Sequence, residues 1–258
     1  MLRDRGTRSS VLLGCSLTIE PSRLPAFLEA LPRAAIASDE LLSPVQPEHE
    51  VWAAGVTYLR SRDARTAESE TKDVYERVYD AARPELFFKS TGPRVRGHGM
   101  PIGVRKDGRW HVPEPELTLV INRELEIVGY TLGNDVSSRD IEGENPLYLP
   151  QAKIFDGSCA VGPGIQLDGV DRLDRLTLTC RISRKNRVIF QGETSTSRIR
   201  RSLPELCEYL GRELEFPRGV FLMTGTGIVP PDDFTLESGD LVEISGGELV
   251  LSNRVDGE

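Results

Sequence analysis

Two alternating runs joined by a short polar turn constrain the fold of this chain more than any other feature. After Glu116, apolar residues at 117, 119 and 121 interleave with residues of the opposite face, which is the pattern of a β-strand. A second alternating run continues to Thr131, and the segment Asn122-Arg123-Glu124 between them predicts a hairpin. The hairpin must bring the residues that precede the first strand back beside those that end the second.

Carboxylates occupy both ends of this hairpin. Glu114 and Glu116 are two residues apart and therefore share one face of the strand. Pro115 points the other way and lacks an N–H, which suits a strand end or edge. Asp135, in the stretch GNDVSSRD, ends the returning strand beside the origin of Glu116. Adjacent carboxylates repel one another unless a proton or a cation lies between them.

We therefore predict that Glu114, Glu116 and Asp135 bind one hard divalent cation. Oxygen donors without histidine or cysteine suit Mg²⁺ or Mn²⁺, whereas zinc favours nitrogen or sulfur. Three carboxylates leave about half of an octahedron free for water or substrate. Two alternatives remain at this point: the acidic residues form a solvated edge, or Asp135 caps a turn or helix start.

Further candidates lie outside the hairpin. Lys153, within YLPQAKIF, is either a surface lysine above apolar neighbours or a buried amine suited to general base work. Glu85 and Lys89 are four apart in a strand-like run and face one side, as site residues or as plain edge charges. Gly225 and Thr226, in TGTG after an apolar run, could offer a backbone amide and a hydroxyl to an anion; a tight turn explains them equally well.

Composition excludes several classes of protein. The 258 residues carry a formal net charge of −8 and no extended basic cluster, which argues against a nucleic-acid or anionic-membrane surface. Nothing approaches 18 consecutive apolar residues, and the apolar patch near the N-terminus is too short for a signal peptide. The cysteines at 15, 159, 180 and 207 lack zinc-site spacing. We expect a cytoplasmic protein.

The pattern along the chain predicts a β-rich α+β fold. Residues 1–50 read as a small N-terminal domain that ends in a linker, and 51–258 as the catalytic domain. Further strands are expected at 51–57, 85–89, 176–182, 188–190, 220–223, 241–244 and 249–251. A helix with a capping box begins at Ser202. Residues 60–79 predict a solvated amphipathic helix or, alternatively, a lid over the site.

These segments resemble the fumarylacetoacetate hydrolase superfamily. The matching stretches are VWAAGVTY, ELFFK, EPELTLVI, GYTLGNDVSSRD, the Lys153 segment, TGTG and SGDLVEISGGELVLSN, in family order over about 200 residues. The resemblance implies a mixed β-roll with a small N-terminal α/β appendage, assembled as a homodimer or homotetramer. It also implies that Glu114, Glu116 and Asp135 bind Mg²⁺, that Lys153 is catalytic, and that Thr226, with Gly225 and Lys89, binds substrate.

One departure from the family pattern points to a different reaction. Carbon–carbon hydrolases of this superfamily carry a histidine about three residues after the tyrosine that corresponds to Tyr58, yet residues 57–82 contain none. VTYLRSRDAR and DIEGENPLYLPQAKIF are instead similar to the branch that dehydrates 2-keto-3-deoxy-D-arabinonate to 2,5-dioxopentanoate, in which Glu85 is a second catalytic residue. The alternatives are an acylpyruvate hydrolase, an oxaloacetate decarboxylase, and a non-catalytic sugar-acid binding protein.

Overall fold

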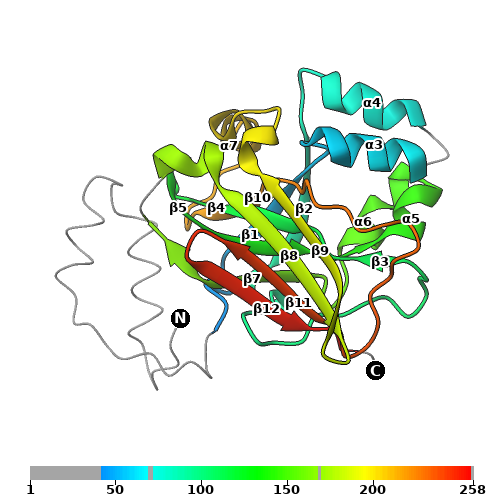
Figure 1. The fold of residues 1–258 in the computed structure, drawn as a ribbon. Helices are drawn as coiled ribbons and strands as arrows, with labels where there is room; N and C mark the ends of the chain where they lie inside the picture. Colours follow the sequence, from blue (N-terminus) through cyan, green and yellow to red (C-terminus); the bar gives the residue numbers. More distant parts are fainter. Residues whose placement is uncertain (1–41, 69–71, 168–169, 257–258) are drawn as a thin grey trace.

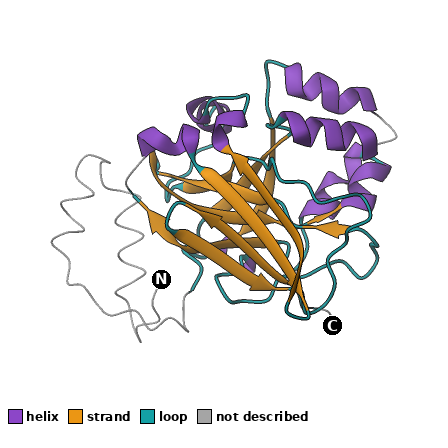
Figure 2. Ribbon diagram, in the orientation of Figure 1, coloured by secondary structure: helices purple, strands orange, loops and turns teal. Residues whose placement is uncertain are grey.

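Three sheets organise the computed structural model, which describes residues 42–68, 72–167 and 170–256. The four-stranded sheet lies across the six-stranded sheet, and most of the helices lie beyond one end of the strands (Figures 1 and 2). The chain is thus β-rich with added helices, which confirms the predicted fold class.

The six-stranded sheet has the order β2-β1-β10-β4-β5-β7. Its strands are β1 (Glu50–Gly55), β2 (Glu85–Thr91), β4 (Pro115–Ile121), β5 (Ile127–Asp135), β7 (Cys159–Gln166) and β10 (Val220–Met223). The four-stranded sheet, in the order β12-β11-β8-β9, is formed by β8 (Thr177–Arg184), β9 (Arg187–Ser195), β11 (Leu241–Gly246) and β12 (Leu249–Arg254). A small third sheet pairs β3 (His111–Val112) with β6 (Ser137–Ser138).

Short helices connect the strands. The α-helices are α3 (Leu59–Glu68), α4 (Lys72–Asp80), α5 (Arg139–Glu144), α6 (Leu149–Lys153) and α7 (Leu203–Leu210), and short stretches of 3-10 helix are η2 (Gly92–Arg94), η3 (Pro146–Tyr148), η4 (Val170–Arg175) and η5 (Thr196–Arg198). The predicted cap of α7 is confirmed, because the Ser202 hydroxyl accepts a hydrogen bond from the Glu205 N–H at 3.2 Å. The helix expected over residues 60–79 is instead the two helices α3 and α4.

The predicted hairpin is confirmed. β4 and β5 pair antiparallel with Leu117 opposite Leu132, and β4 begins at Pro115, where the missing N–H costs least. Every residue of β4 is buried because the strand is central and both faces are covered. β7, whose sequence CAVGPGIQ contains glycines and a proline, was not predicted.

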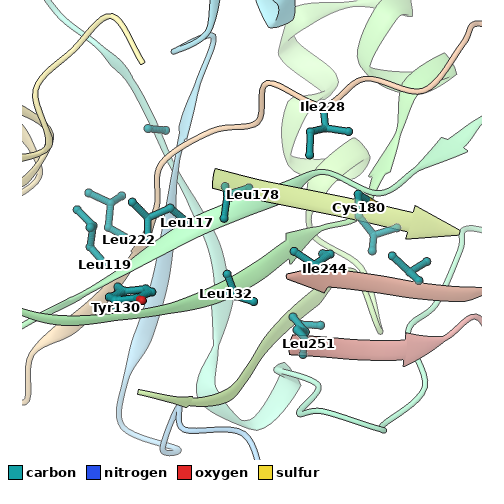
Figure 3. Close-up of a cluster of buried hydrophobic side chains, with 14 of the residues drawn as sticks. Leu117, Leu119, Tyr130, Leu132, Leu178, Cys180, Leu222, Ile228, Ile244 and Leu251 are labelled. Carbon is teal, nitrogen blue, oxygen red and sulfur yellow. The ribbon is translucent and has the colours of Figure 1, made fainter. Parts of the chain in front are cut away.

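The core lies between the two larger sheets. Alternate residues of β4 and β5 meet residues of β8, β11 and β12 there, and the cluster is drawn in Figure 3; it includes Leu117, Leu119, Leu132, Leu178, Ile244 and Leu251. The opposite face of the six-stranded sheet carries a second cluster that includes Val51, Val120 and Phe221. Burial of both faces fixes the strand register, because a slip of one residue would move the side chains of each cluster to the opposite face of the sheet.

The N-terminal part of the chain is described only from residue 42 onward. Most of the predicted N-terminal domain, residues 1–41, therefore lies outside the described residues, and the division at residue 50 stays a prediction. Residues 45–49 pack onto the sheet: Val45 and His49 are buried, and a His49 ring nitrogen lies 3.0 Å from the Arg218 carbonyl oxygen.

Candidate active site

One end of the six-stranded sheet gathers all the predicted site residues. β1 and β10 are parallel and end there, whereas β2 and β4 run the other way and begin there. β5 also ends there, and β7 begins beside its last residue, since Asp135 is opposite Cys159. Segments far apart in the sequence are thereby brought to a single edge.

The hairpin places the three predicted metal ligands together. The Asp135 N–H donates to the Glu114 carbonyl oxygen at 3.0 Å, which ties the end of β5 to the residue before β4. One carboxylate oxygen from each of Glu114, Glu116 and Asp135 lies within 4.8 Å of the others, and all three side chains are buried. Asp135 does not cap α5, because Ser138 occupies the N-cap position. The solvated-edge alternative therefore fails.

Three buried cations surround these carboxylates, and two of them are lysines. The Lys153 amine donates to Glu114 at 2.7 Å, to Asp135 at 3.0 Å and to the Ser137 hydroxyl at 2.7 Å. Lys89 is fully buried, forms an ion pair with Asp135 and donates to the carbonyl oxygens of Val136 and Lys153. Lys153 is thus a buried amine rather than a surface lysine.

Arg139 and Glu142 complete the cluster, and the sequence analysis missed both. The Arg139 guanidinium donates to Glu114 at 2.9 Å and lies 3.7 Å from a Glu142 oxygen. The surplus of acidic residues was a signal that a further cation was needed, and Arg139 stands in the same GNDVSSRD motif as Asp135. Glu142 follows one helical turn later, so that both side chains of α5 face the cluster.

Glu116 is buried among the other carboxylates, and these surroundings change its pKa. Burial raises its pKa well above the ordinary value of 4.5, and the charges of Asp135 and Glu114 raise it further. Its own hydrogen bond comes from the Gly225 N–H, at 2.6 Å. A carboxyl group in such surroundings holds its proton unless a cation takes the proton's place.

A divalent cation therefore fits the residues present. The donors are carboxylate oxygens alone, as Mg²⁺ and Mn²⁺ prefer, and they converge on one point. Their mutual repulsion, visible in the raised pKa of Glu116, is what a double positive charge would relieve.

A tight cavity adjoins the cluster and holds the second predicted catalytic residue. Its walls include Glu85, Phe87, Glu114, Asp135, Glu142 and Lys153, and its free volume is about 20 Å³. Glu85 and Lys153 thus face the same small space from opposite elements, β2 and α6. Val56, also in the wall, has φ of +51°, a strained conformation for a β-branched residue and one that clusters at functional sites.

The glycine-rich segment after β10 has a different arrangement from the one expected. The Gly225 amide is engaged by Glu116, and the Thr226 hydroxyl bonds to the backbone of Ile228. Gly225 needs to be glycine, because its φ is +90° and a Cβ would lie 2.0 Å from the Thr57 hydroxyl. In the structure Gly225, like Lys89, contacts the cluster, whereas Thr226 bonds within its own turn; the predicted contacts of all three with substrate stay a prediction.

The β-rich fold and the buried carboxylate cluster are those expected of a β-roll enzyme with a divalent-cation site. Comparison with known proteins identifies the family. Residues 50–256 match the family model "Fumarylacetoacetate (FAA) hydrolase C-terminal". The chain belongs to this family.

Among curated proteins, the chain is similar to two archaeal dehydratases. It is 50% identical over 214 residues to the "Probable 2-keto-3-deoxyxylonate dehydratase" of Haloferax volcanii, covering 82% of this chain and 73% of the relative. It is 45% identical over 210 residues to the "2-dehydro-3-deoxy-D-arabinonate dehydratase" of Saccharolobus solfataricus, covering 80% and 70%.

A solved structure is also similar, with 41% sequence identity and a TM-score of 0.78 over 91% of this chain and 80% of the other; it is described as "2-keto-3-deoxy-D-arabinonate dehydratase complexed with magnesium and 2,5-dioxopentanoate". Within the part of this chain that the structure describes, no helix is long and apolar enough to cross a membrane.

Proposed function

We propose that this protein is a Mg²⁺-dependent dehydratase that converts 2-keto-3-deoxy-D-arabinonate to 2,5-dioxopentanoate in pentose catabolism. The single observation that carries the proposal is the convergence of Glu114, Glu116 and Asp135 beside Lys153 and Glu85. The similarity to dehydratases of 45–50% identity supports it. The xylonate and arabinonate in their names differ only at stereocentres that the 2-keto-3-deoxy form lacks, when both sugars belong to the D series.

The carboxylates Glu114, Glu116 and Asp135 would hold the cation. When bound, it would polarise a 2-oxo acid that chelates it through carboxylate and keto oxygens, and so favour loss of a C3 proton. Lys153 and Glu85 lie on the same small cavity, and one of them accepts that proton while the other donates a proton to the departing C4 hydroxyl. The elimination leaves a double bond between C3 and C4; C5 then loses a proton while C3 gains one, and the resulting enol becomes the C5 aldehyde, so that the net change is loss of one water.

The surroundings of Lys153 suit a proton-transfer role. Its amine donates hydrogen bonds to three oxygen atoms, which hold the side chain in one rotamer. Phe87, whose ring centre is 5.7 Å from the amine, closes one side against water. Two of the three partners are predicted metal ligands, so a cation on them would compete with the ammonium for negative charge and favour a free amine.

The missing histidine supports elimination over hydrolysis. Residues 57–82 offer no imidazole to activate water, and the nearest ionisable groups in the tight cavity are carboxylates and an amine.

The test is direct turnover. Purified protein is incubated with Mg²⁺ and 2-keto-3-deoxy-D-arabinonate, and the 2,5-dioxopentanoate formed is followed with a coupled aldehyde dehydrogenase. Turnover of acylpyruvates or oxaloacetate without this product would support the hydrolase or decarboxylase alternatives. Binding without turnover of any of them would support a sugar-acid binding protein.

Three further parts of the proposal concern the whole protein. We propose residues 1–50 as a separate small domain, a homodimer or homotetramer as the assembly, and a cytoplasmic location. Size-exclusion chromatography with light scattering decides the assembly.

A further inference from the structure

A second, much larger cavity has Tyr58 in its wall, two residues after Val56, which lines the first. Its free volume is about 680 Å³, and it is formed by α3, the end of α4, the end of β9 and the segment after Gly227. Residues that line it include Tyr58, Arg60, Tyr79, Thr194 and Arg198. The cavity of about 20 Å³ at Lys153 is too small to enclose a whole five-carbon acid, whereas this one has room for the end of the molecule that projects beyond it.

Two hydroxyl groups at this cavity have no hydrogen-bond partner among the described residues. The Tyr58 hydroxyl and the Thr194 hydroxyl are both buried, with the side chains 1% and 3% exposed. Buried polar groups are nearly always hydrogen-bonded, since leaving one unpaired is costly. Two such hydroxyls on one cavity point to a ligand that supplies the missing partner.

Both groups meet at Gly227, which keeps them close to each other. A Cβ at Gly227 would lie 2.4 Å from the Thr194 hydroxyl oxygen and 2.5 Å from the Tyr58 ring. Only glycine therefore allows this approach.

Tyr58 also stands close to the carboxylate cluster along the chain: the hydroxyl of its neighbour Thr57 donates to the Thr224 carbonyl oxygen at 2.7 Å, and the next residue, Gly225, donates to Glu116. Burial raises the pKa of the Tyr58 phenol, and the negative charge of Glu116 raises it further, so the hydroxyl remains a donor at physiological pH. Thr194 can both donate and accept. Together they match the needs of an alcohol, which also donates once and accepts.

The rim of the cavity carries charged side chains of both signs, which suits the uncharged hydroxyl end of the acid. Arg60 donates to the Val229 carbonyl oxygen at 3.4 Å, and Arg198 is exposed beside it. Of the acidic residues in the wall, Asp63 is paired with Arg62, and Asp232 is exposed.

We propose that the hydroxyls of Tyr58 and Thr194 form the subsite for the terminal C5 hydroxyl of the sugar acid. The proposal rests on the proposed function. With the 2-oxo acid end at Glu114, Glu116 and Asp135, and C3 and C4 at Lys153 and Glu85, the C5 end extends past Tyr58 into the large cavity. The pair selects hydroxylated acids over acids that end in a methyl group.

The test compares two substrates. 2-Keto-3-deoxy-D-arabinonate carries the C5 hydroxyl, and 4-hydroxy-2-oxopentanoate keeps the C4 leaving group but ends in a methyl group; its dehydration product is a conjugated enone, followed by absorbance. We expect the wild type to prefer the first substrate in kcat/KM by about tenfold to a hundredfold, the usual effect of one buried hydroxyl partner. In Tyr58→Phe and in Thr194→Val the preference should fall several-fold, through loss of activity on the hydroxylated substrate alone. Tyr209→Phe, on α7 away from the cavity, is the matched control and should keep the wild-type preference.

Each outcome has a defined meaning. A wild type that turns over the sugar acid without preferring it, or variants that both keep the full preference, would overturn the subsite while leaving the proposed function intact. A wild type inactive on both substrates would instead contradict the proposed function. Thermal unfolding of each variant checks the fold, and Thr194→Val decides if Tyr58→Phe does not fold.

Discussion

Two buried carboxylates, Asp240 and Glu116, differ in how their charge is balanced. Both are at most 1% exposed. Asp240 receives two hydrogen bonds of 2.8 Å from the Arg184 guanidinium and one of 2.9 Å from the Glu237 N–H. Glu116 receives one backbone N–H and lies next to two further carboxylates. Asp240 is satisfied within the protein, whereas Glu116 requires something more.

The difference teaches how to separate a structural charge from a functional one. Arg184 joins Asp240 to Glu237 and to the Thr235 carbonyl oxygen, and its pKa is raised chiefly by the hydrogen bond to Asp240. Such a bidentate pair ties the β11 end of the four-stranded sheet to β8. A carboxylate that lies beside other carboxylates is repelled by them and so destabilises the fold. A protein retains such repulsion where a cation or a proton binds.

Exchanging Glu116 for Gln should give the largest functional effect. Gln keeps an acceptor for the Gly225 N–H but loses the charge, so we expect Mg²⁺-dependent turnover to fall by roughly a thousandfold. Stability of the metal-free protein should stay equal or rise, because the repulsion from Asp135 and Glu114 is removed. The measurements are steady-state kinetics and urea unfolding in EDTA. Retained Mg²⁺-dependent activity would remove Glu116 from the site.

Asp240→Asn, the corresponding change at the other buried carboxylate, should have the opposite effect and lower stability rather than activity. It leaves Arg184 without its carboxylate partner, and since Arg184 is partly exposed we expect a loss of about 2–3 kcal/mol in the free energy of unfolding. Below its unfolding temperature this variant should retain kcat. If Asp240→Asn lowers activity and Glu116→Gln lowers stability, the comparison between the two carboxylates is wrong.

Lys153→Met separates chemistry from metal binding. The variant keeps the volume of the side chain but removes the amine that acts on the C3 or C4 position, so kcat should fall about a hundredfold or more. Mg²⁺ should bind at least as tightly, because Glu114 and Asp135 lose a competing positive charge. Isothermal titration calorimetry gives the affinity. Equal loss of turnover and of Mg²⁺ affinity would indicate that Lys153 has a structural role.

Sequence reasoning reached the hairpin and its carboxylates because both depend on short-range periodicity. The spacing of Glu114 and Glu116 and the turn at Asn122 are enough to return Asp135 to their side. Arg139 and Tyr58 could not be found in that way: their importance arises from burial beside groups distant in sequence. Gly225 was found as a candidate from its glycine-rich motif, but the contact of its amide with Glu116 could not be foreseen, because it requires β10 to lie beside β4.

Arg139→Lys tests whether the cations around the cluster position its ligands. Lysine keeps the charge but cannot reach Glu114 and Glu142 with one planar group. We expect Mg²⁺ affinity to weaken about tenfold to a hundredfold, as for other residues that orient a metal ligand. At saturating Mg²⁺, kcat should recover, which loss of a catalytic group would not allow. An unchanged affinity would mean that Glu114 is positioned by Lys153 alone.

The smallest expected effect concerns pH and follows from the raised pKa of Glu116. The unfolded chain loses this proton near 4.5, whereas the metal-free folded protein holds it to higher pH. Stability of the metal-free protein due to this group is therefore full below 4.5 and is lost as pH rises through the raised folded pKa. Mg²⁺ requires the ionised form, so binding releases a proton within this window, and the affinity rises by up to about tenfold per pH unit.

Titration calorimetry in two buffers of different ionisation heat counts the released proton. Asp240→Asn should release as many protons as the wild type, since Asp240 lies outside the cluster, whereas Glu116→Gln should release about one fewer. Equal proton release by wild type and Glu116→Gln would contradict the assignment of the stored proton to Glu116. Glu116 would then resemble Asp240, because neither carboxylate would hold a proton that the cation displaces.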